Sequence, residues 1–427
     1  MNKALSVINL VVVLLLTTVY FYQFVYTVVG AVCRRKRPSY TAKKQHSFAA
    51  LICARNESPV IGELVQSLKE QHYPKELFDI YVLADNCTDD TADAARRAGA
   101  LVYERNDKTR VGKGFAMDFL IRHIKADRGE DAYDAFFVFD ADNIVDPEFV
   151  AEMNKTYDQG YEAATSYRNS KNFASNWISA DYSIWFLREA RFMNYPRMLL
   201  GNGCAVSGTG FMVSNLLIKE NNGWPFHLLT EDIQFSVNCA IAGHKIGYCD
   251  NAVVYDEQPT SFAQSWKQRL RWSKGFYQVD AHYLLPLARG AVRNKGRRMT
   301  CYDMLMTVIP CMLLTIAVFA ANLFVAISAL TMPHYMMGLV LHTALRYLLF
   351  SVVNYYVGMF AYGALTVACE WKHIRATNWE KIKYLWSYPI FGATYIPITI
   401  AALSRGKVEW SHIEHHSSAE LAKEEIR

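Results

Sequence analysis

Apolar and polar positions divide the chain into three parts. Residues 4–33 carry no charged side chain, and residues 304–369 carry a single formal charge, at Arg346. A helix of about 20 apolar residues suffices to cross the roughly 30 Å of hydrocarbon in a bilayer. The stretch between these regions, residues 34–303, mixes polar and apolar positions as a globular domain does. The pattern therefore predicts one membrane span, a globular domain and then further membrane helices.

Within the globular part, continuous apolar runs alternate with helical patterns. The expected strands cover residues 47–56, 78–85, 101–105 and 134–139, and the first expected helices cover 59–69 and 89–98. Strands alternating with helices are typical of a parallel sheet covered on both faces. Later elements are a long aromatic-rich helix over 174–195, a tight turn at 208–210 and a helix over 230–242 capped by Thr230.

Several apolar segments follow the globular part. Residues 304–330 and 347–369 are each long enough to span a membrane. Residues 335–345 could lie in the membrane interface or extend the second helix. The final stretch, 384–403, contains two prolines and has basic residues on both sides, so it could cross the membrane or dip in and return.

The charges beside the first span predict its orientation. Six basic residues follow it at once: Arg34, Arg35, Lys36, Arg37, Lys43 and Lys44. Because basic residues beside a span tend to stay in the cytoplasm, we expect an integral protein of the cell membrane with a cytoplasmic globular domain. A cleaved signal peptide is the alternative, but the apolar run is long for one and has no obvious small-residue cleavage site.

Composition excludes some classes of function. The net charge is only +5, and most of the basic excess flanks membrane segments, so nucleic acid is not an expected partner. The nine cysteines show no paired metal spacing and read as reduced, buried residues. The histidines between 412 and 416 lack further ligands at a suitable spacing, and they do not by themselves predict a metal site.

Polar residues follow the ends of three expected strands. Arg55 and Glu57 follow the first strand, Asp85 ends the second, and Asp140 and Asp142 follow the fourth. In open parallel sheets, ligands bind outside the carboxyl ends of the strands. Two carboxylates at such an end could hold Mg²⁺ or Mn²⁺ together with substrate phosphates. Acidic pairs there are also frequent as turns or helix caps, so the pair alone does not decide.

Three other places carry candidate chemistry. Lys113 between two glycines could neutralise a diphosphate, or it could be a solvated loop lysine. Glu231 and Asp232 open a helix, where first-turn acidic residues need no further function. A basic, aromatic stretch, Gln268-Arg-Leu-Arg-Trp272, suits phosphate, sugar or lipid headgroups, and it also fits an interfacial amphipathic helix.

Taken in order, these elements resemble the processive family-2 glycosyltransferases, which include cellulose, chitin, hyaluronan and poly-N-acetylglucosamine synthases. The matching elements are Ala54-Arg-Asn-Glu57, Asp85, Gly112-Lys-Gly114, Asp140-Ala-Asp142, Thr230-Glu-Asp232 and Gln268-Arg-Leu-Arg-Trp272. The resemblance covers about residues 34–298, and the last element is the most specific part.

The resemblance implies an α/β fold of the GT-A (nucleotide-diphospho-sugar transferase) type flanked by transmembrane helices, a UDP-sugar donor, and Mg²⁺ or Mn²⁺ as cofactor. It implies that Asp232, with Glu231 beside it, is the general base, and that Asp142 and Asp140 hold the metal ion. The donor site would contain Arg55, Glu57, Asp85, Lys113, Asp140, Gln268, Arg269 and Arg271, with Asp85 on uracil. The acceptor side would contain Trp272, Gly208 and Thr209. Trp410 would lie near the catalytic entrance.

We expect five segments from these patterns. They are an N-terminal transmembrane helix (1–33), a GT-A domain (34–260), the Q-x-x-R-W and interfacial helices (261–300), a C-terminal transmembrane bundle (301–403) and a tail (404–427).

The acceptor remains open between two alternatives. Several downstream membrane segments and the Q-x-x-R-W element favour a polysaccharide that is extended and exported, because a translocating chain needs a lined path. Transfer of one sugar to a membrane lipid, such as a diacylglycerol or a polyprenyl phosphate, is the alternative. A non-catalytic membrane protein that binds nucleotide-sugars is a third interpretation. The identity of the sugar and the need for an accessory subunit are not readable from the sequence.

Overall fold

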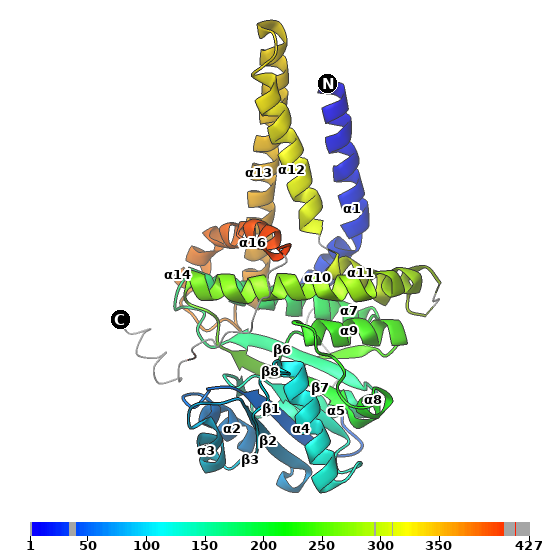
Figure 1. Ribbon diagram of the computed structural model, residues 1–427, viewed down its shortest axis with the longest axis vertical. Helices are drawn as coiled ribbons and strands as arrows, with labels where there is room; N and C mark the ends of the chain where they lie inside the picture. The colour runs from blue at the N-terminus through cyan, green and yellow to red at the C-terminus, as the bar shows by residue number, and fades with distance from the viewer. Residues whose placement is uncertain (1, 34–39, 294–295, 310, 405–414, 416–427) are drawn as a thin grey trace.

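The computed structural model describes residues 2–33, 40–293, 296–309, 311–404 and 415 (Figure 1). An α/β domain lies at one end, helices cross its top, and long helices project away from it. Two helices are long and apolar enough to cross a membrane, or up to three if a bent pair counts as one span. The expected order of span, globular domain and further membrane helices is confirmed.

The domain is built on one eight-stranded mixed sheet with the order β3-β2-β1-β4-β7-β6-β8-β5. The strands are β1 (Phe48–Ala54), β2 (Phe78–Asp85), β3 (Leu101–Arg105), β4 (Ala135–Phe139), β5 (Ile144–Val145), β6 (Ala163–Ser170), β7 (Phe211–Ser214) and β8 (Ile246–Asp256). β1 pairs in parallel with β2 and β4, and Phe48 is level with Phe78 and Ala135. β7 runs antiparallel to both β4 and β6. The expected parallel sheet is confirmed for β1 to β4, the strands for which it was predicted, and the other half is mixed because β6 pairs in parallel with β8 but antiparallel with β7.

The second half of the sheet has a weak signal in the sequence. β6 contains Thr165, Ser166, Arg168 and Asn169 among its eight residues, and β7 has only four residues. A strand that carries polar side chains into a binding site does not present the continuous apolar run of a buried strand. The pattern is informative at β1, β2 and β4 because most residues of these strands are buried.

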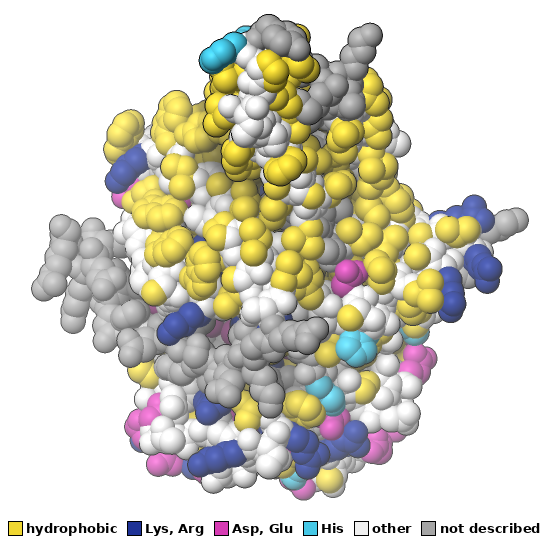
Figure 2. All heavy atoms as spheres, turned by 45° about the horizontal axis from the view of Figure 1, so that its top comes forward, with side chains coloured by type: hydrophobic (Ala, Val, Ile, Leu, Met, Phe, Trp, Pro, Cys, Tyr) yellow, Lys and Arg dark blue, Asp and Glu magenta, His cyan; other side chains and the backbone are white. Residues whose placement is uncertain are grey.

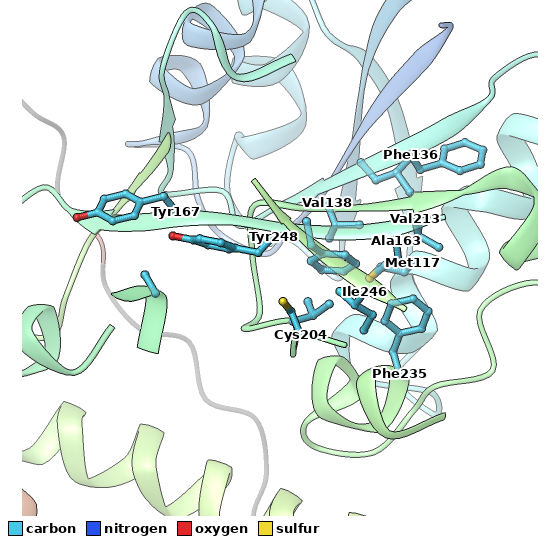
Figure 3. Packing of buried hydrophobic residues seen from close by; sticks show 14 of the residues in the cluster. Met117, Phe136, Val138, Ala163, Tyr167, Cys204, Val213, Phe235, Ile246 and Tyr248 are labelled. Carbon is cyan, nitrogen blue, oxygen red and sulfur yellow. The ribbon is translucent and has the colours of Figure 1, made fainter. Parts of the chain in front are cut away.

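Helices cover both faces of the sheet. The domain helices are α2 (Ile61–Lys69), α3 (Thr91–Ala98), α4 (Lys113–Arg128), α5 (Phe149–Asp158), α6 (Trp177–Glu189), α7 (Tyr195–Leu199), α8 (Asn215–Glu220) and α9 (Glu231–Ala242). Leu51 of β1 faces a core that includes Met117 of α4 and Phe235 of α9 (Figure 3). Its neighbours Ala50 and Ile52 face the opposite core with α2 and α5. The alternation explains why β1 is apolar throughout.

The expected aromatic helix over 174–195 is present in a modified form. α6 continues through a π-helical segment, η2 (Ala190–Asn194), into α7. Asn176 caps the start of α6 by accepting hydrogen bonds from the backbone N–H groups of Ile178 and Ser179. π-helical turns inside α-helices are rare and frequently lie at functional sites.

The projecting helices are apolar over most of their surface (Figure 2). They are α1 (Asn2–Val32), α12 (Cys311–Ala329), which follows α11 (Arg298–Val308), and α13 (His334–Glu370). α13 includes residues 335–345, so this segment extends the helix rather than lying in the interface. α11 and α12 meet at a bend of 48°, so they could form a third, broken span.

The C-terminal apolar stretch lies on the domain side of the spans. It forms the short 3-10 helix η3 (Tyr384–Trp386), α15 (Tyr388–Ala393) and α16 (Tyr395–Ala402), and it follows the polar helix α14 (Asn378–Lys383). α16 packs against the long helix α10 (Phe262–Arg293) (Figure 1). The apolar part, Tyr388–Ala402, is too short to cross about 30 Å of hydrocarbon as a helix. Among the two expectations for this stretch, dipping in and returning fits the described helices.

A reciprocal amide pair joins α1 to α12. Asn9 Nδ2 donates to Asn322 Oδ1 at 3.1 Å, and Asn322 Nδ2 donates to Asn9 Oδ1 at 3.0 Å. Replacing either residue with leucine should destabilise the protein by about 1 kcal/mol, because such hydrogen bonds between membrane helices contribute at this scale. Melting of the detergent-solubilised protein checks this, with V13L on the exposed side of α1 as control. We expect the double variant to lose no more stability than one single variant, and additive losses would contradict the pairing.

Candidate active site

The carboxyl ends of β1, β2 and β4 meet at one edge of the sheet, where Asp85 and Asp140 lie. Asp85 is buried and accepts hydrogen bonds from Arg105 Nη1 at 3.1 Å and from Asn86 Nδ2 at 3.0 Å. Burial raises the pKa of Asp85, although the nearby guanidinium groups of Arg105 and Arg55 oppose this shift. The strand-end carboxylate therefore sits in a closed, polar setting.

Lys113, the first residue of α4, is a bridging cation of the site and not a solvated loop lysine. Its Nζ donates to the carboxylate of Asp140 and, at 2.7 Å, to the backbone oxygen of Gly208. Burial alone would lower the pKa of Lys113, but the carboxylates of Asp140 and Glu231 outweigh burial and raise it. The positive charge of Lys113 is thereby held close to Asp140, Gly208 and Glu231.

Gly208 marks the centre of the cluster. Its φ of 77° lies in the left-handed region that favours glycine. A Cβ atom at this position would lie 3.9 Å from Asp232 Oδ2 and 4.0 Å from Asp140 Oδ2. The next residue, Thr209, is buried, and its hydroxyl accepts a hydrogen bond from the backbone N–H of Asp140 at 3.0 Å. The two carboxylates thus flank one point that is kept free of side-chain atoms.

Glu231 and Asp232 begin α9. Burial, followed by repulsion from Asp232, raises the pKa of Glu231 to about 7. Burial also raises the pKa of Asp232, while Lys113 and Arg271 act in the opposite direction. The expected cap is absent, because the Thr230 side chain makes no capping hydrogen bond and its hydroxyl is buried without a partner among the described residues. The hydroxyl of Thr230 therefore does not cap the helix, whereas a hydrogen bond from the backbone N–H of Ile233 opposes the rise in the pKa of Asp232.

Asp142 belongs to a group that could hold a metal ion. One ligand atom each from Asp142, Glu257 and His415 lies within 4.8 Å of the others. His415 Nδ1 is 3.6 Å from Asp142 Oδ2 and 3.5 Å from Glu257 Oε2. Two carboxylates and an imidazole suit Mn²⁺ or a related divalent ion. Asp140 was expected in the same role, but it contacts Lys113 and is not in this group.

His415 comes from the histidine cluster that did not by itself predict a metal site. Burial opposes its protonation, but Asp142 and Glu257 outweigh burial and raise the pKa of His415 to about 10. Burial likewise raises the pKa of the nearby Glu57 to about 8. No spacing pattern in the sequence indicates Glu257 or His415 as ligands, because each comes close to Asp142 only through the fold. Trp410 lies outside the described residues.

A second layer of hydrogen bonds fixes Asp142. Asn143 Nδ2 donates to Asp142 Oδ1 at 3.3 Å and to Asp256 Oδ1 at 2.9 Å. Arg168 Nε donates to Asp256 Oδ2 at 2.9 Å, and the backbone N–H of Glu257 donates to Asp142 Oδ2 at 3.1 Å. Such partners orient metal ligands and raise metal affinity.

The Q-x-x-R-W residues lie on α10. Gln268 is three residues from Arg271 and four from Trp272, and Arg269 is three residues from Trp272. Arg269 and Trp272 both lie 5.9 Å from the centre of the Tyr182 ring. Arg271 lies within electrostatic reach of Glu231. Gln268 Oε1 is buried without a hydrogen-bond partner among the described residues. The ring of Trp272 meets Tyr182 and Phe186 edge-on at centroid distances of 5.9 Å and 6.2 Å.

Arg269 does not join the carboxylate cluster, contrary to the expected diphosphate contact. It is fully buried, and its Nη1 donates to Thr394 Oγ1 at 2.6 Å and to the backbone oxygen of Phe391 at 3.2 Å. The guanidinium also lies 4.3 Å from the centre of the Phe391 ring. Arg269 therefore fastens α10 to α15 and α16.

Replacing Arg269 with methionine should lower the melting temperature by several degrees, because buried backbone and hydroxyl groups lose their partner at a cost of about 1–3 kcal/mol. We expect the dissociation constant for UDP to stay within about twofold of the wild-type value, a shift below about 0.5 kcal/mol. Thermal melting and UDP titration of the detergent-solubilised protein check both points. A tenfold loss of UDP affinity with normal melting would restore Arg269 to the donor site.

The sheet order, the acidic cluster at its carboxyl edge and the flanking apolar helices define a membrane protein with a GT-A-type domain. The glycosyltransferase like family 2 matches residues 45–275 of the chain. The chain belongs to this family.

Individual relatives are distant. A β-monoglucosyldiacylglycerol synthase of Synechocystis sp. is 26% identical over 239 residues, which is 55% of this chain and 48% of that protein. A poly-β-1,6-N-acetyl-D-glucosamine synthase of Staphylococcus aureus is 23% identical over 257 residues, which is 57% of this chain and 58% of that protein. The chain thus spans about half the length of the curated relatives it matches.

A solved structure supports the fold. The mannosyltransferase PcManGT from Pyrobaculum calidifontis, in complex with GDP-Man and Mn²⁺, superposes with a TM-score of 0.51 and 16% identity. The match covers 86% of this chain and 98% of that chain. At this identity the similarity concerns the fold alone.

Proposed function

We propose that the protein transfers a sugar, with inversion, from a UDP-sugar to a hydroxyl group of a membrane-bound acceptor on the cytoplasmic face of the membrane. The carrying observation is that Asp232 and Asp140 flank the free position at Gly208, with Lys113 fixed beside it. This arrangement leaves space for a reacting group between a carboxylate base and a positive charge.

The side chains divide the chemistry among them. Asp232 accepts the proton of the acceptor hydroxyl as the new bond forms, since a hydroxyl is a poor nucleophile until a base removes its proton. Lys113 and Arg271 offset the negative charge that grows on the leaving diphosphate. Asp142, Glu257 and His415 would hold Mg²⁺ or Mn²⁺, which supplies further positive charge to that diphosphate. Asp85 would bind the uracil ring. One displacement with one base predicts inversion at the anomeric carbon.

The exposure of the spans supports a lipid acceptor. Only 11% of the most apolar window of each candidate span is buried. An export path for a polysaccharide needs a polar lining enclosed by helices, whereas a lipid acceptor needs only access from the bilayer. The name of the Synechocystis relative describes sugar transfer to a diacylglycerol. The second candidate is a polysaccharide synthase, which Trp272 in the Q-x-x-R-W element and the Staphylococcus aureus relative favour.

Product analysis tests the proposal. Membranes containing the protein are incubated with radiolabelled UDP-glucose, UDP-galactose, UDP-N-acetylglucosamine or UDP-glucuronate and with Mn²⁺, then extracted with chloroform and methanol. We expect label from one donor in a lipid of low molecular weight. Label in a high-molecular-weight, water-soluble product would favour the polysaccharide synthase, and no release of UDP from any donor would refute both candidates.

A further inference from the structure

A small cavity lies between β6 and the α6–η2 helix, directly beside Gly208. Its walls include Ser166, Arg168, Phe186, Glu189, Asn194 and Ser207. The enclosed space suits a group of about the size of one water molecule or one hydroxyl. Ser207 and Thr209 both line the cavity and are the chain neighbours of Gly208, so the cavity borders the same turn that Asp232 approaches.

Two side chains in this cavity have hydrogen-bonding capacity to spare. The hydroxyl of Ser166 is buried and has no hydrogen-bond partner among the described residues. A carboxylate can accept about four hydrogen bonds, and Glu189 accepts one from Ser207 Oγ at the long distance of 3.4 Å. Leaving a buried polar group unsatisfied costs about 1–3 kcal/mol, so a ligand that bonds both groups gains this energy.

Arg168 is fixed and shapes the cavity. Its Nη1 donates to the backbone oxygen of Ser207 at 3.0 Å, and Nε binds Asp256 at 2.9 Å. Its guanidinium lies 3.7 Å from the centre of the Phe186 ring. Arg168 therefore holds the Ser207–Gly208 turn in place and leaves Ser166 and Glu189 to meet the ligand. The π-helical segment η2 begins immediately after Glu189, as such segments often do at functional sites.

We propose that this cavity binds a second hydroxyl group of the acceptor, and that the acceptor therefore presents a sugar ring to Asp232. A hydroxyl both donates and accepts, so it matches the Glu189 carboxylate and the Ser166 hydroxyl together. A sugar carries hydroxyls on neighbouring carbons, and one can enter the cavity while its neighbour faces Asp232. A diacylglycerol has one hydroxyl and leaves the cavity without a match. This inference rests on the proposed function and narrows its acceptor to a sugar-bearing lipid.

The test compares two lipids in phosphatidylcholine vesicles that contain the full-length protein. One vesicle set carries diacylglycerol and the other carries monoglucosyldiacylglycerol, with Mn²⁺ and the UDP-sugar that the donor screen selects. We expect the wild-type protein to use the sugar lipid with a kcat/KM at least about tenfold higher, as expected when a polar site is left unmatched. S166A and E189Q should each raise the KM for the sugar lipid by about tenfold, the scale of one hydrogen bond.

Controls separate acceptor binding from folding and donor binding. E148Q, which alters an exposed glutamate, should leave the acceptor KM unchanged. The dissociation constant for UDP should be the same in all four proteins, and a shared loss of UDP affinity in S166A and E189Q would overturn the inference as a folding defect. An unchanged acceptor KM in both variants, or preference for diacylglycerol, would reduce the cavity to a site for a structural water.

Failure of the proposed function gives a different result. If the protein makes a polymer and labels neither lipid, the lipid acceptor is wrong. The same variants are then assayed with a soluble oligosaccharide of the product sugar as acceptor. A raised KM for that oligosaccharide would support the hydroxyl site on a polymer acceptor, and an unchanged KM would refute the site.

Discussion

Replacing Asp232 with asparagine is expected to lower sugar transfer by about a thousandfold, within the range that general bases contribute. Asp232 Oδ2 faces the free position at Gly208, and asparagine keeps its shape but cannot take a proton. The variant should bind UDP with near wild-type affinity, because Lys113 and Asp142 remain in place. Initial rates of radiolabelled product formation and calorimetric UDP titration measure the two properties.

Glu231 supplies the matched control for this experiment. It is the chain neighbour of Asp232, also buried, and its pKa is raised to about 7. We expect E231Q to reduce transfer far less than D232N, because the carboxylates next to the Gly208 position belong to Asp232 and Asp140 and not to Glu231. Near-normal activity of D232N together with an inactive E231Q would transfer the role of base to Glu231.

The half of the sheet that could be predicted is the half whose strands are buried on both faces. β1 is apolar throughout and is followed by Arg55, and β2 is apolar from Ile80 to Ala84 and ends at Asp85, so the edge carrying Asp85 is readable from the sequence. β6 and β8 interleave polar side chains with apolar ones, because one end of each strand carries residues of the site, such as Arg168 and Asp256. Polar site residues within a strand interrupt its apolar pattern, so such a strand is harder to predict from the sequence.

The sequence predicts candidate site residues that directly follow a strand. It does not predict which of these residues contact residues from distant parts of the chain. Asp140 and Asp142 follow β4, yet the fold gives one to Lys113 and the other to Glu257 and His415. No spacing rule links these residues, since each pair is joined only by the folded chain. The placement of Arg269 likewise depends on long-range contacts, because its partners Phe391 and Thr394 are far from it in sequence.

Replacing Asp142 or His415 is expected to have the second large effect, a change in the metal dependence of UDP binding. D142N and H415A should each weaken Mn²⁺-dependent UDP binding by at least about tenfold, the scale seen when partners of a metal site are removed. In EDTA the affinity for UDP should be the same in wild type and variants, because the proposed contact of Asp85 with uracil is unchanged. Titration of UDP binding against Mn²⁺ concentration measures the difference.

Asp140 separates the two possible metal sites. If Asp140 and Asp142 were both ligands, D140N would shift the Mn²⁺ requirement as strongly as D142N. The structure instead joins Asp140 to Lys113, so D140N should slow transfer while the Mn²⁺ concentration for half-maximal UDP binding stays unchanged. Equal shifts of the Mn²⁺ requirement in D140N and D142N, with H415A behaving as wild type, would show that Asp140 and Asp142 bind the metal ion and that His415 does not. Because His415 lies far from Asp142 in sequence, its effect on metal affinity also tests whether His415 contributes to the donor site.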